Sequence, residues 1–225
     1  IFMGKNGNIG AAVIGYGGMG GWHTRKIQEI KGIELIGIYD ILDDRCKLSE
    51  KNGIHAFCSR EELLADERVT LVTVATPNDY HKEIVIAALE AGKNVICEKP
   101  VALNSSDLEE MIAVAKKTGK LFTVHQNRRW DEDYLTAKKI IDDNMLGKVY
   151  NIESRVQGDR GVPGDWRNRK AQGGGMVLDW GVHLLDQVLM LKEKQKLVSV
   201  YAQLTFVTSD EVDDGFKTML KFDDN

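Results

Sequence analysis

The chain of 225 residues is poor in cysteine and proline and has no long apolar run. Its three cysteines, Cys46, Cys58 and Cys97, lie far apart and form no CxxC pair, so neither a zinc site nor a disulfide framework is indicated. No apolar stretch approaches the roughly 20 residues that a membrane-spanning helix needs, and we predict no membrane segment. Free cysteines favour a reducing, cytoplasmic compartment.

The sequence also lacks a large excess of charge of one sign. The formal net charge is −4 and no polybasic run occurs. The sequence therefore offers no electrostatic surface for nucleic acid or for an anionic membrane. With 43% hydrophobic residues, the chain has enough apolar material for one large core or two smaller ones. We expect small-molecule chemistry rather than nucleic-acid or membrane binding.

The first half of the chain alternates short apolar runs with amphipathic stretches. The apolar runs predict buried strands over residues 9–14, 34–39, 70–75, 94–97 and 121–125. The amphipathic stretches predict helices over residues 19–30, 43–52, 60–65, 81–91 and 107–118. Ser59 with Glu62 fits a capping box, as does Ser106 with Glu109, and Gly119 suits a helix C-terminus. The alternation predicts βαβ units, and hence an α/β doubly wound parallel sheet of the Rossmann type.

After residue 126 the pattern changes. Residues 148–157, 198–206 and 216–222 alternate apolar with polar side chains, and a helix is predicted over residues 176–190. One face of the middle segment is expected to lie on a core: Val198, Val200, Ala202, Leu204 and Phe206. We predict an α+β C-terminal domain with an open, mainly antiparallel sheet. The predicted domains are residues 1–126 and 127–225, the second of them incomplete because three strands and one helix make a thin core.

A glycine-rich turn follows the first predicted strand. Residues 15–20 read Gly-Tyr-Gly-Gly-Met-Gly, the GxGxxG pattern, and a helix is predicted to follow. In a dinucleotide site the first glycine permits the tight turn, the second lets the backbone approach the pyrophosphate, and the third lets helix and strand pack closely. The alternative is a purely structural turn. We expect five residues to bind the cofactor: Gly15, Gly17, Gly18, Met19 and Gly20.

Asp40 lies 20 residues after Gly20, the separation expected for the acid that binds the adenosine ribose. A carboxylate there accepts hydrogen bonds from both ribose hydroxyls and repels a 2′-phosphate. We therefore predict NAD as cofactor and NADP as less favoured. Arg45, one helical turn later, keeps NADP open.

Further motifs follow along the chain. They are Ala75-Thr76-Pro77-Asn78 with His81, Glu98-Lys99-Pro100, residues 126–129 (Gln-Asn-Arg-Arg), Trp166-Arg167, and residues 173–175 (three glycines) before Asp179-Trp180-Gly181-Val182-His183. In this order and spacing, from residue 9 to 222, they resemble the Gfo/Idh/MocA oxidoreductases, the family of glucose–fructose oxidoreductase and inositol 2-dehydrogenase.

The resemblance implies a site. Lys99 is expected to project at the nicotinamide and the substrate hydroxyl, with Pro100 after a cis peptide bond, and Asp179 and His183 match the catalytic pair. Additional cofactor contacts are expected from Thr76, Pro77, Asn78, His81 and Glu98, and substrate contacts from Arg128, Trp166 and Arg167. The resemblance also implies a homodimer or homotetramer packed through the C-terminal sheet.

The residues themselves agree with these roles. Asp179 and His183 are spaced i, i+4 and so share one helical face. An imidazole suits the role of base and acid, a nearby carboxylate orients it, and the Lys99 ammonium stabilises an alkoxide. Which of Lys99 and His183 takes the first proton stays open. Two structural alternatives also stay open: Lys99 as a solvated surface residue, and His183 as a residue of the core. Asp179, His183 and Asp186 share a face, but with no second histidine at ligand spacing we expect no metal.

The sequence thus favours an NAD-dependent dehydrogenase that acts on a sugar or a cyclic polyol. Two alternatives stay open. One is an NAD-dependent glycosidase of the same fold, which oxidises a sugar hydroxyl transiently. The other is a non-catalytic regulator that senses a dinucleotide.

Overall fold

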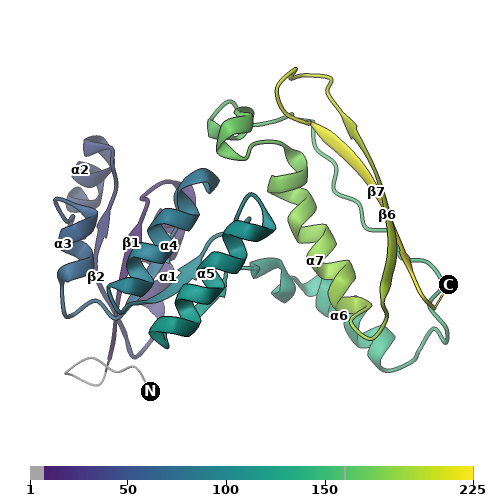
Figure 1. Cartoon of the computed structure of the whole chain (residues 1–225), viewed down its shortest axis with the longest axis horizontal. Helices are drawn as coiled ribbons and strands as arrows, with labels where there is room; N and C mark the ends of the chain where they lie inside the picture. Colours follow the sequence, from purple (N-terminus) through teal and green to yellow (C-terminus); the bar gives the residue numbers. More distant parts are fainter. Residues whose placement is uncertain (1–7, 160, 225) are drawn as a thin grey trace. The chain divides into compact units, whose positions relative to one another are not determined.

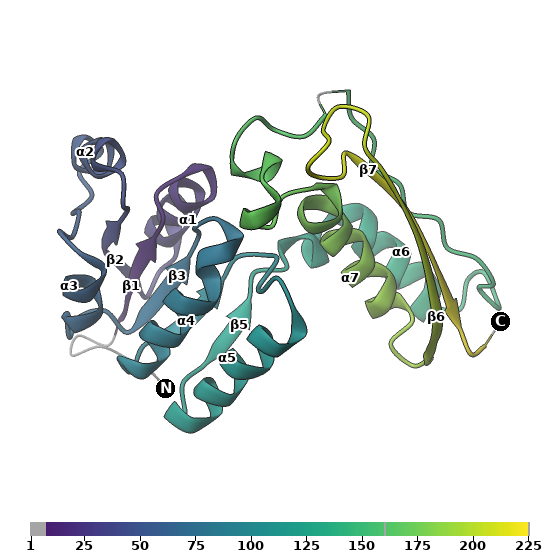
Figure 2. The ribbon, with the colours of Figure 1, turned by 45° about the horizontal axis from the view of Figure 1, so that its top comes forward.

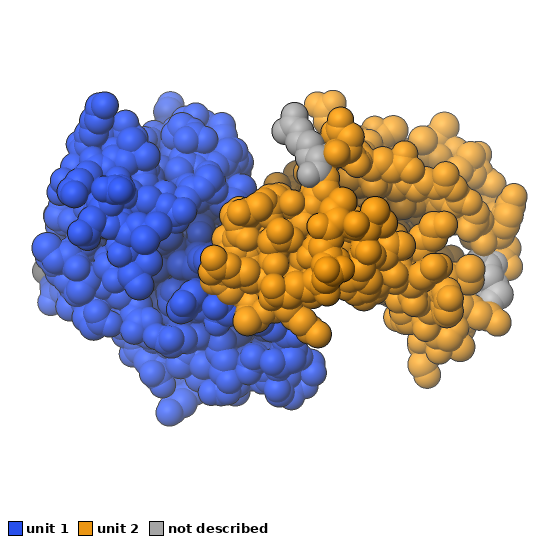
Figure 3. Space-filling view, turned by 90° about the horizontal axis from the view of Figure 1, so that it is seen from above, with its two compact units in different colours: residues 1–125 blue, residues 126–225 orange. Residues whose placement is uncertain are grey.

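The computed structural model describes residues 8–159 and 161–224. The chain divides into two units, residues 1–125 and 126–225, which Figure 3 colours separately. No helix in the described parts of the chain is long and apolar enough to cross a membrane.

Unit 1 is built on a five-stranded parallel sheet with the strand order β2-β1-β3-β4-β5 (Figures 1 and 2). Its strands are β1 (Ile9–Ile14), β2 (Ile33–Tyr39), β3 (Leu71–Val74), β4 (Asn94–Cys97) and β5 (Phe122–Val124). The helices between them are α1 (Gly18–Glu29), α2 (Asp43–Lys51), α3 (Arg60–Ala65), α4 (His81–Glu90) and α5 (Ser105–Thr118). The predicted doubly wound α/β fold is confirmed.

Alternating residues of β1 supply both cores of this unit. Ala11 and Val13 pack with Ile27 of α1 on one face of the sheet. Ala12 and Ile14 belong to the larger core on the other face, which α4 and α5 cover. Helices on both faces explain why the strands read as continuous apolar runs rather than as alternating ones.

The strand register brings the ends of four strands to one line. Ile14 pairs with Val74, Val74 with Cys97, and Cys97 with Val124. The residues that follow these strand ends, Gly15, Ala75, Glu98 and His125, are therefore neighbours at the carboxyl edge of the sheet. Ligands of open α/β sheets bind at this edge.

Helix caps test the local predictions. The Ser59 hydroxyl accepts the Glu62 N–H at 3.0 Å, which confirms a side-chain cap for α3. Gly119 ends α5 at a φ of 65°, as predicted. The capping box predicted at Ser106 is wrong, because Asn104 caps α5 by accepting the Asp107 N–H at 2.9 Å. Asn and Ser are equally good caps, and both occur in this segment.

Unit 2 contains α6 (Glu132–Asp142), α7 (Val182–Leu191), and an antiparallel pair, β6 (Leu197–Thr205) and β7 (Gly215–Phe222) (Figure 1). Short helical turns precede α6 and α7: η2 (Asn127–Trp130), η3 (Trp166–Asn168), η4 (Lys170–Gln172) and the π-helical η5 (Val177–Gly181). The α+β class and the antiparallel sheet are confirmed.

Three details of unit 2 correct the sequence prediction. Residues 148–157 form no strand, because a strand needs a hydrogen-bonded neighbour and the described part of unit 2 pairs only β6 with β7. Helix α6 was not predicted. The helix predicted over residues 176–190 begins as a π-helical turn.

The apolar face of β6 also differs from expectation. Phe216 and Phe222 of β7 face the interior, since the Phe216 ring lies against Gly181 and Phe222 is buried. On β6, by contrast, Val198 is 58% and Val200 57% exposed. Among the described residues, the predicted core therefore packs against β7, whereas the predicted core face of β6 is exposed.

Candidate active site

The glycine turn after β1 is shaped by backbone contacts. A Cβ on Gly20 would lie 1.8 Å from the Gly15 carbonyl oxygen, and one on Gly15 would lie 2.6 Å from the Ala75 oxygen. Gly15 also has a φ of +92°, a conformation that other residues rarely adopt. Helix α1 starts at Gly18 without a side-chain cap. Its first N–H groups and the positive end of its dipole fit a diphosphate.

Asp40 closes this turn from the end of β2. Its buried carboxylate accepts the Tyr16 N–H at 2.7 Å and the Leu42 N–H at 2.9 Å, and Arg45 donates to it at 3.2 Å. Asp40 therefore holds the glycine turn in place, in addition to the ribose contact predicted from its position.

Arg45 lies beside the same turn. Its guanidinium is partly exposed, and a Cβ on Gly17 would lie 3.3 Å from its Nη1. A cation over the glycine turn is suited to an anionic group of a dinucleotide. The position of Arg45 is therefore relevant to whether the site binds NAD or NADP.

The loop after β3 carries Thr76, Pro77 and Asn78. Asn78 is buried, and Pro77 precedes the turn η1 (Asn78–Tyr80). The Thr76 hydroxyl is buried and has no hydrogen-bond partner among the described residues. A buried hydroxyl costs free energy unless it is bonded, so this site fits a polar group of a bound cofactor.

His81, the first residue of α4, ties two loops together. Its Nδ1 lies 2.9 Å from the Pro100 oxygen and its Nε2 lies 3.0 Å from the Thr76 oxygen. Burial lowers the pKa of His81, against the effect of the two carbonyl oxygens. The ring has no exposed surface. In this structure the His81 ring supports the two loops, and the cofactor contact predicted for His81 stays a prediction.

Glu98, Lys99 and Pro100 follow β4. The Glu98 side chain is buried, and its Oε1 lies 2.7 Å from His23 Nε2 and 2.9 Å from His125 Nδ1. Its Oε2 accepts the Lys99 N–H at 3.2 Å. Burial raises the pKa of Glu98, but hydrogen bonds from His125 and His23 outweigh it and bring the pKa to about 2. The cis peptide bond before Pro100 is confirmed.

His23 and His125 were not singled out in the sequence. They belong to α1 and to the end of β5, and their rings lie edge to face with a centroid distance of 4.6 Å. The Trp22 ring contacts both. Among the described residues, His23, Glu98 and His125 are also a group whose ligand atoms, all within 4.8 Å of one another, could hold a metal ion. The strand register brings Glu98 beside His125, and the packing of α1 brings His23 to them, which explains why no local motif revealed the group.

The candidate residues of unit 2 gather around η5. Arg167 Nε lies 3.3 Å from Asp179 Oδ1, and the Arg167 guanidinium stacks 4.4 Å from the Trp166 ring. His183, one turn beyond Asp179, is buried. π-Helical turns occur frequently at functional sites because they reorient side chains.

Trp180 lies near both His183 and Arg128. Its ring centroid lies 6.1 Å from that of His183 at an angle of 71°, and the Arg128 guanidinium lies 4.3 Å from the Trp180 ring. The expected catalytic and substrate residues of unit 2 therefore form one contiguous cluster.

Asp213 is a further residue that the sequence did not reveal. Its carboxylate accepts the Val177 N–H at 2.8 Å, and its carbonyl accepts the Met176 N–H at 2.9 Å. A Cβ on Gly175 would lie 2.2 Å from Asp213 Oδ1, which explains the glycine there. Asp213 thus anchors the start of the helix that carries Asp179 and His183.

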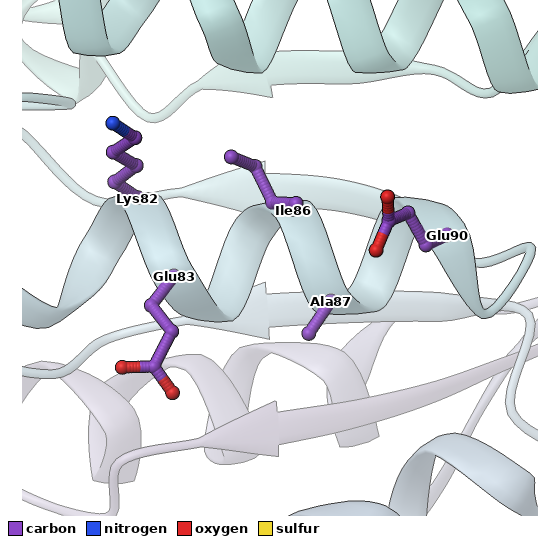
Figure 4. A pocket seen from close by; sticks show the side chains of 5 residues that line it. All are labelled: Lys82, Glu83, Ile86, Ala87 and Glu90. Atoms are coloured by element: carbon purple, nitrogen blue, oxygen red, sulfur yellow. The ribbon is translucent and has the colours of Figure 1, made fainter.

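A separate hollow lies on the outer face of α4 (Figure 4). Five side chains of this one helix line it: Lys82, Glu83, Ile86, Ala87 and Glu90. Figure 4 shows them pointing to two sides of the helix rather than converging. The arrangement lacks the convergent polar groups of a ligand site.

The ionised Glu98 predicts acid sensitivity. Its pKa lies below its usual 4.5, so its stabilisation is present above pH 4.5 and is lost as the pH falls towards 2. Between pH 5 and pH 3, we expect the free energy of unfolding to fall by about 2 kcal/mol more in the wild type than in Glu98→Gln. Urea unfolding at each pH measures this. The exposed-site control Glu90→Gln should follow the wild type; equal slopes for Glu98→Gln and wild type would contradict the assignment.

Comparisons with known proteins agree with this geometry. Residues 9–126 match the model of an oxidoreductase family with an NAD-binding Rossmann fold, and residues 134–225 match the GFO/IDH/MocA C-terminal domain. The crystal structure of an NAD-binding protein from Listeria innocua is 49% identical, with a TM-score of 0.94, over 96% of this chain and 64% of that one.

Two curated relatives are similar in sequence. Oxidoreductase C115.03 of Schizosaccharomyces pombe is 37% identical over 82% of this chain and 53% of its own length. The scyllo-inositol 2-dehydrogenase (NADP(+)) IolW of Bacillus subtilis is 33% identical over 68% of this chain and 43% of its own. The chain spans about half the length of these relatives. With both domain models matched, the chain belongs to the Gfo/Idh/MocA family of oxidoreductases.

Proposed function

We propose that this protein is an NAD-dependent dehydrogenase that transfers hydride between a nicotinamide and a secondary hydroxyl of a cyclic polyol or sugar. The observation that carries the proposal is the Glu98-Lys99-Pro100 segment, in which Lys99 is partly exposed between two buried residues. It lies at the carboxyl edge of the sheet, beside a glycine turn and an unsatisfied Thr76 hydroxyl that fit a dinucleotide. The name of the Bacillus subtilis relative, a scyllo-inositol 2-dehydrogenase, supports a polyol substrate.

The oxidation of an alcohol removes a proton and a hydride from the substrate. The hydroxyl proton passes to a base, and the carbon-bound hydrogen leaves as hydride, which a bound nicotinamide accepts. In our proposal His183 takes the proton, and the Lys99 ammonium stabilises the alkoxide that forms. Asp179, held by Arg167 at 3.3 Å, orients the imidazole and stabilises its charged form. Arg128 and Trp166 contact the substrate.

A substrate screen tests this function. We expect a member of a panel of inositols and aldoses to reduce NAD, seen as absorbance at 340 nm with the whole protein. Loss of the electrostatic stabilisation by Lys99 should lower kcat by about 100-fold or more in Lys99→Met. The exposed Lys47→Met is the matched control and should keep full activity.

Other outcomes of the screen would refute the proposal. If no polyol or sugar reduces NAD while a nitrophenyl glycoside releases its aglycone, the protein is a glycosidase. If NAD binds tightly and nothing turns over, it is a regulator.

Within this proposal NAD is the preferred cofactor and Arg45 permits some use of NADP. The Asp40 carboxylate disfavours a 2′-phosphate, whereas the Arg45 guanidinium bonded to it can turn towards one. We expect Arg45→Ala to lower kcat/KM with NADP by about 10- to 100-fold and with NAD by much less, since a hydrogen bond between charged groups contributes about 1.5–3 kcal/mol. Lys47→Ala, on the same helix, is the control. Equal losses with both cofactors would contradict this role for Arg45.

We also infer that copies of the protein associate through the sheet of unit 2. The exposed outer face of the sheet, opposite the face of Phe216, supports this: Ser199, Tyr201, Gln203 and Thr205 of β6 with Met219 of β7. On this face the paired side chains Tyr201 and Met219 are 65% and 70% exposed, and large exposed apolar side chains favour association. Analytical ultracentrifugation of the whole protein should show a dimer or tetramer, and Tyr201→Glu should shift it towards the monomer. A monomeric wild type would refute the inference.

A further inference from the structure

Glu98 links three elements of unit 1. It follows β4, while its partners lie on α1 (His23) and directly after β5 (His125). In the sheet, Cys97 pairs with Val124, so Glu98 and His125 are neighbours by register. His23 comes three residues after Gly20, on the helix that begins at the glycine turn. The contacts therefore connect the cofactor turn with the edge of the sheet.

The two imidazoles satisfy Glu98 Oε1, so this oxygen needs no further hydrogen-bond partner. A neutral imidazole donates one N–H, and an ionised carboxylate only accepts. His23 Nε2 and His125 Nδ1 both lie within donating distance of the same oxygen, at 2.7 and 2.9 Å. Since hydrogen bonds to a charged group are the stronger ones, two such donors hold the buried carboxylate firmly.

The second carboxylate oxygen acts on the chain next to it. Glu98 Oε2 accepts the Lys99 N–H at 3.2 Å, and on the other side the Pro100 oxygen lies 2.9 Å from the His81 ring. The backbone on both sides of Lys99 is therefore held by buried polar groups. The direction of the Lys99 Cβ, and with it the reach of its ammonium, depends on these contacts.

We propose that His23, Glu98 and His125 form a positioning network that sets the place of Lys99 and links it to the glycine turn at the start of α1. The inference rests on the proposed function for its effect on turnover. Binding of a dinucleotide at the turn is then transmitted, through α1 and His23, to Lys99.

The competing interpretation is that His23, Glu98 and His125 bind a divalent metal ion. A tetrahedral zinc ion about 2.0–2.1 Å from each ligand would hold the ligand atoms about 3.3 Å apart. The observed 2.7 and 2.9 Å are hydrogen-bond distances instead. The network therefore needs no ion, and the experiment measures metal content directly.

The test compares variants that keep or remove the donor. His125→Asn and His23→Gln keep an N–H near the Nδ1 and Nε2 positions, whereas His125→Leu and His23→Leu remove it. His55→Leu, an exposed histidine of the same unit, is the control. We expect the two donor-free variants to lower kcat at least tenfold, with KM for the polyol and Kd for NAD within about threefold of the wild type. The donor-keeping variants should recover most of kcat.

A second readout does not depend on turnover. The rate at which an amine reagent modifies Lys99, followed by mass spectrometry, should change at least threefold when NAD is added to the wild type. In His23→Leu this response to NAD should shrink while NAD still binds. If the wild type turns over no polyol but the labelling response depends on His23, the proposed function fails and the network stands.

Three results would overturn the network. They are donor-free variants with kcat within threefold of the wild type, an unchanged labelling response to NAD in His23→Leu, or stoichiometric zinc in the purified protein that is lost in His23→Leu.

Discussion

Parallel pairing of β1, β3, β4 and β5 is the constraint on which the site of unit 1 depends. Because Ile14, Val74, Cys97 and Val124 stand in register, the residues after them meet at one edge. The close approach of Gly15 to Ala75 and the contact of Glu98 with His125 are both direct consequences. Residues far apart in the sequence become one site because a sheet aligns its strand ends.

Buried polar groups then stabilise the loops at this edge. An unpaired buried charge is costly, and here the buried carboxylates of Asp40 and Glu98 each accept several hydrogen bonds. Asp40 binds the backbone of Tyr16 and Leu42, and Glu98 binds two imidazoles and the Lys99 N–H. The same contacts that make burial tolerable therefore fix the glycine turn and the lysine loop. Asp213 has the corresponding function in unit 2, where it anchors η5.

Local patterns predicted most of unit 1 but not its long-range contacts. The bounds of β1, β4 and α3 agree with the predicted ranges, since apolar runs and caps are local signals. The contacts of Glu98 with His125 and His23 depend on strand register and on the packing of α1, and no local motif encodes either. In unit 2, alternation alone predicted a strand over residues 148–157, where no partner strand pairs with it in the described chain. The π-helical turn at Asp179 was not predicted either, because the sequence there is compatible with an α-helix; its start is bonded to Asp213, which is distant in the sequence.

We propose that Lys99 and His183 act on the same hydride transfer. A double-mutant cycle with Lys99→Met, His183→Asn and the combined variant tests it most directly, measured as kcat of the whole protein with the substrate that the screen identifies. Residues that act as a unit are strongly non-additive. We predict that the combined variant is no more than about threefold slower than the slower single variant. Losses that multiply, so that the double variant is slower by the product of the two, would contradict the account.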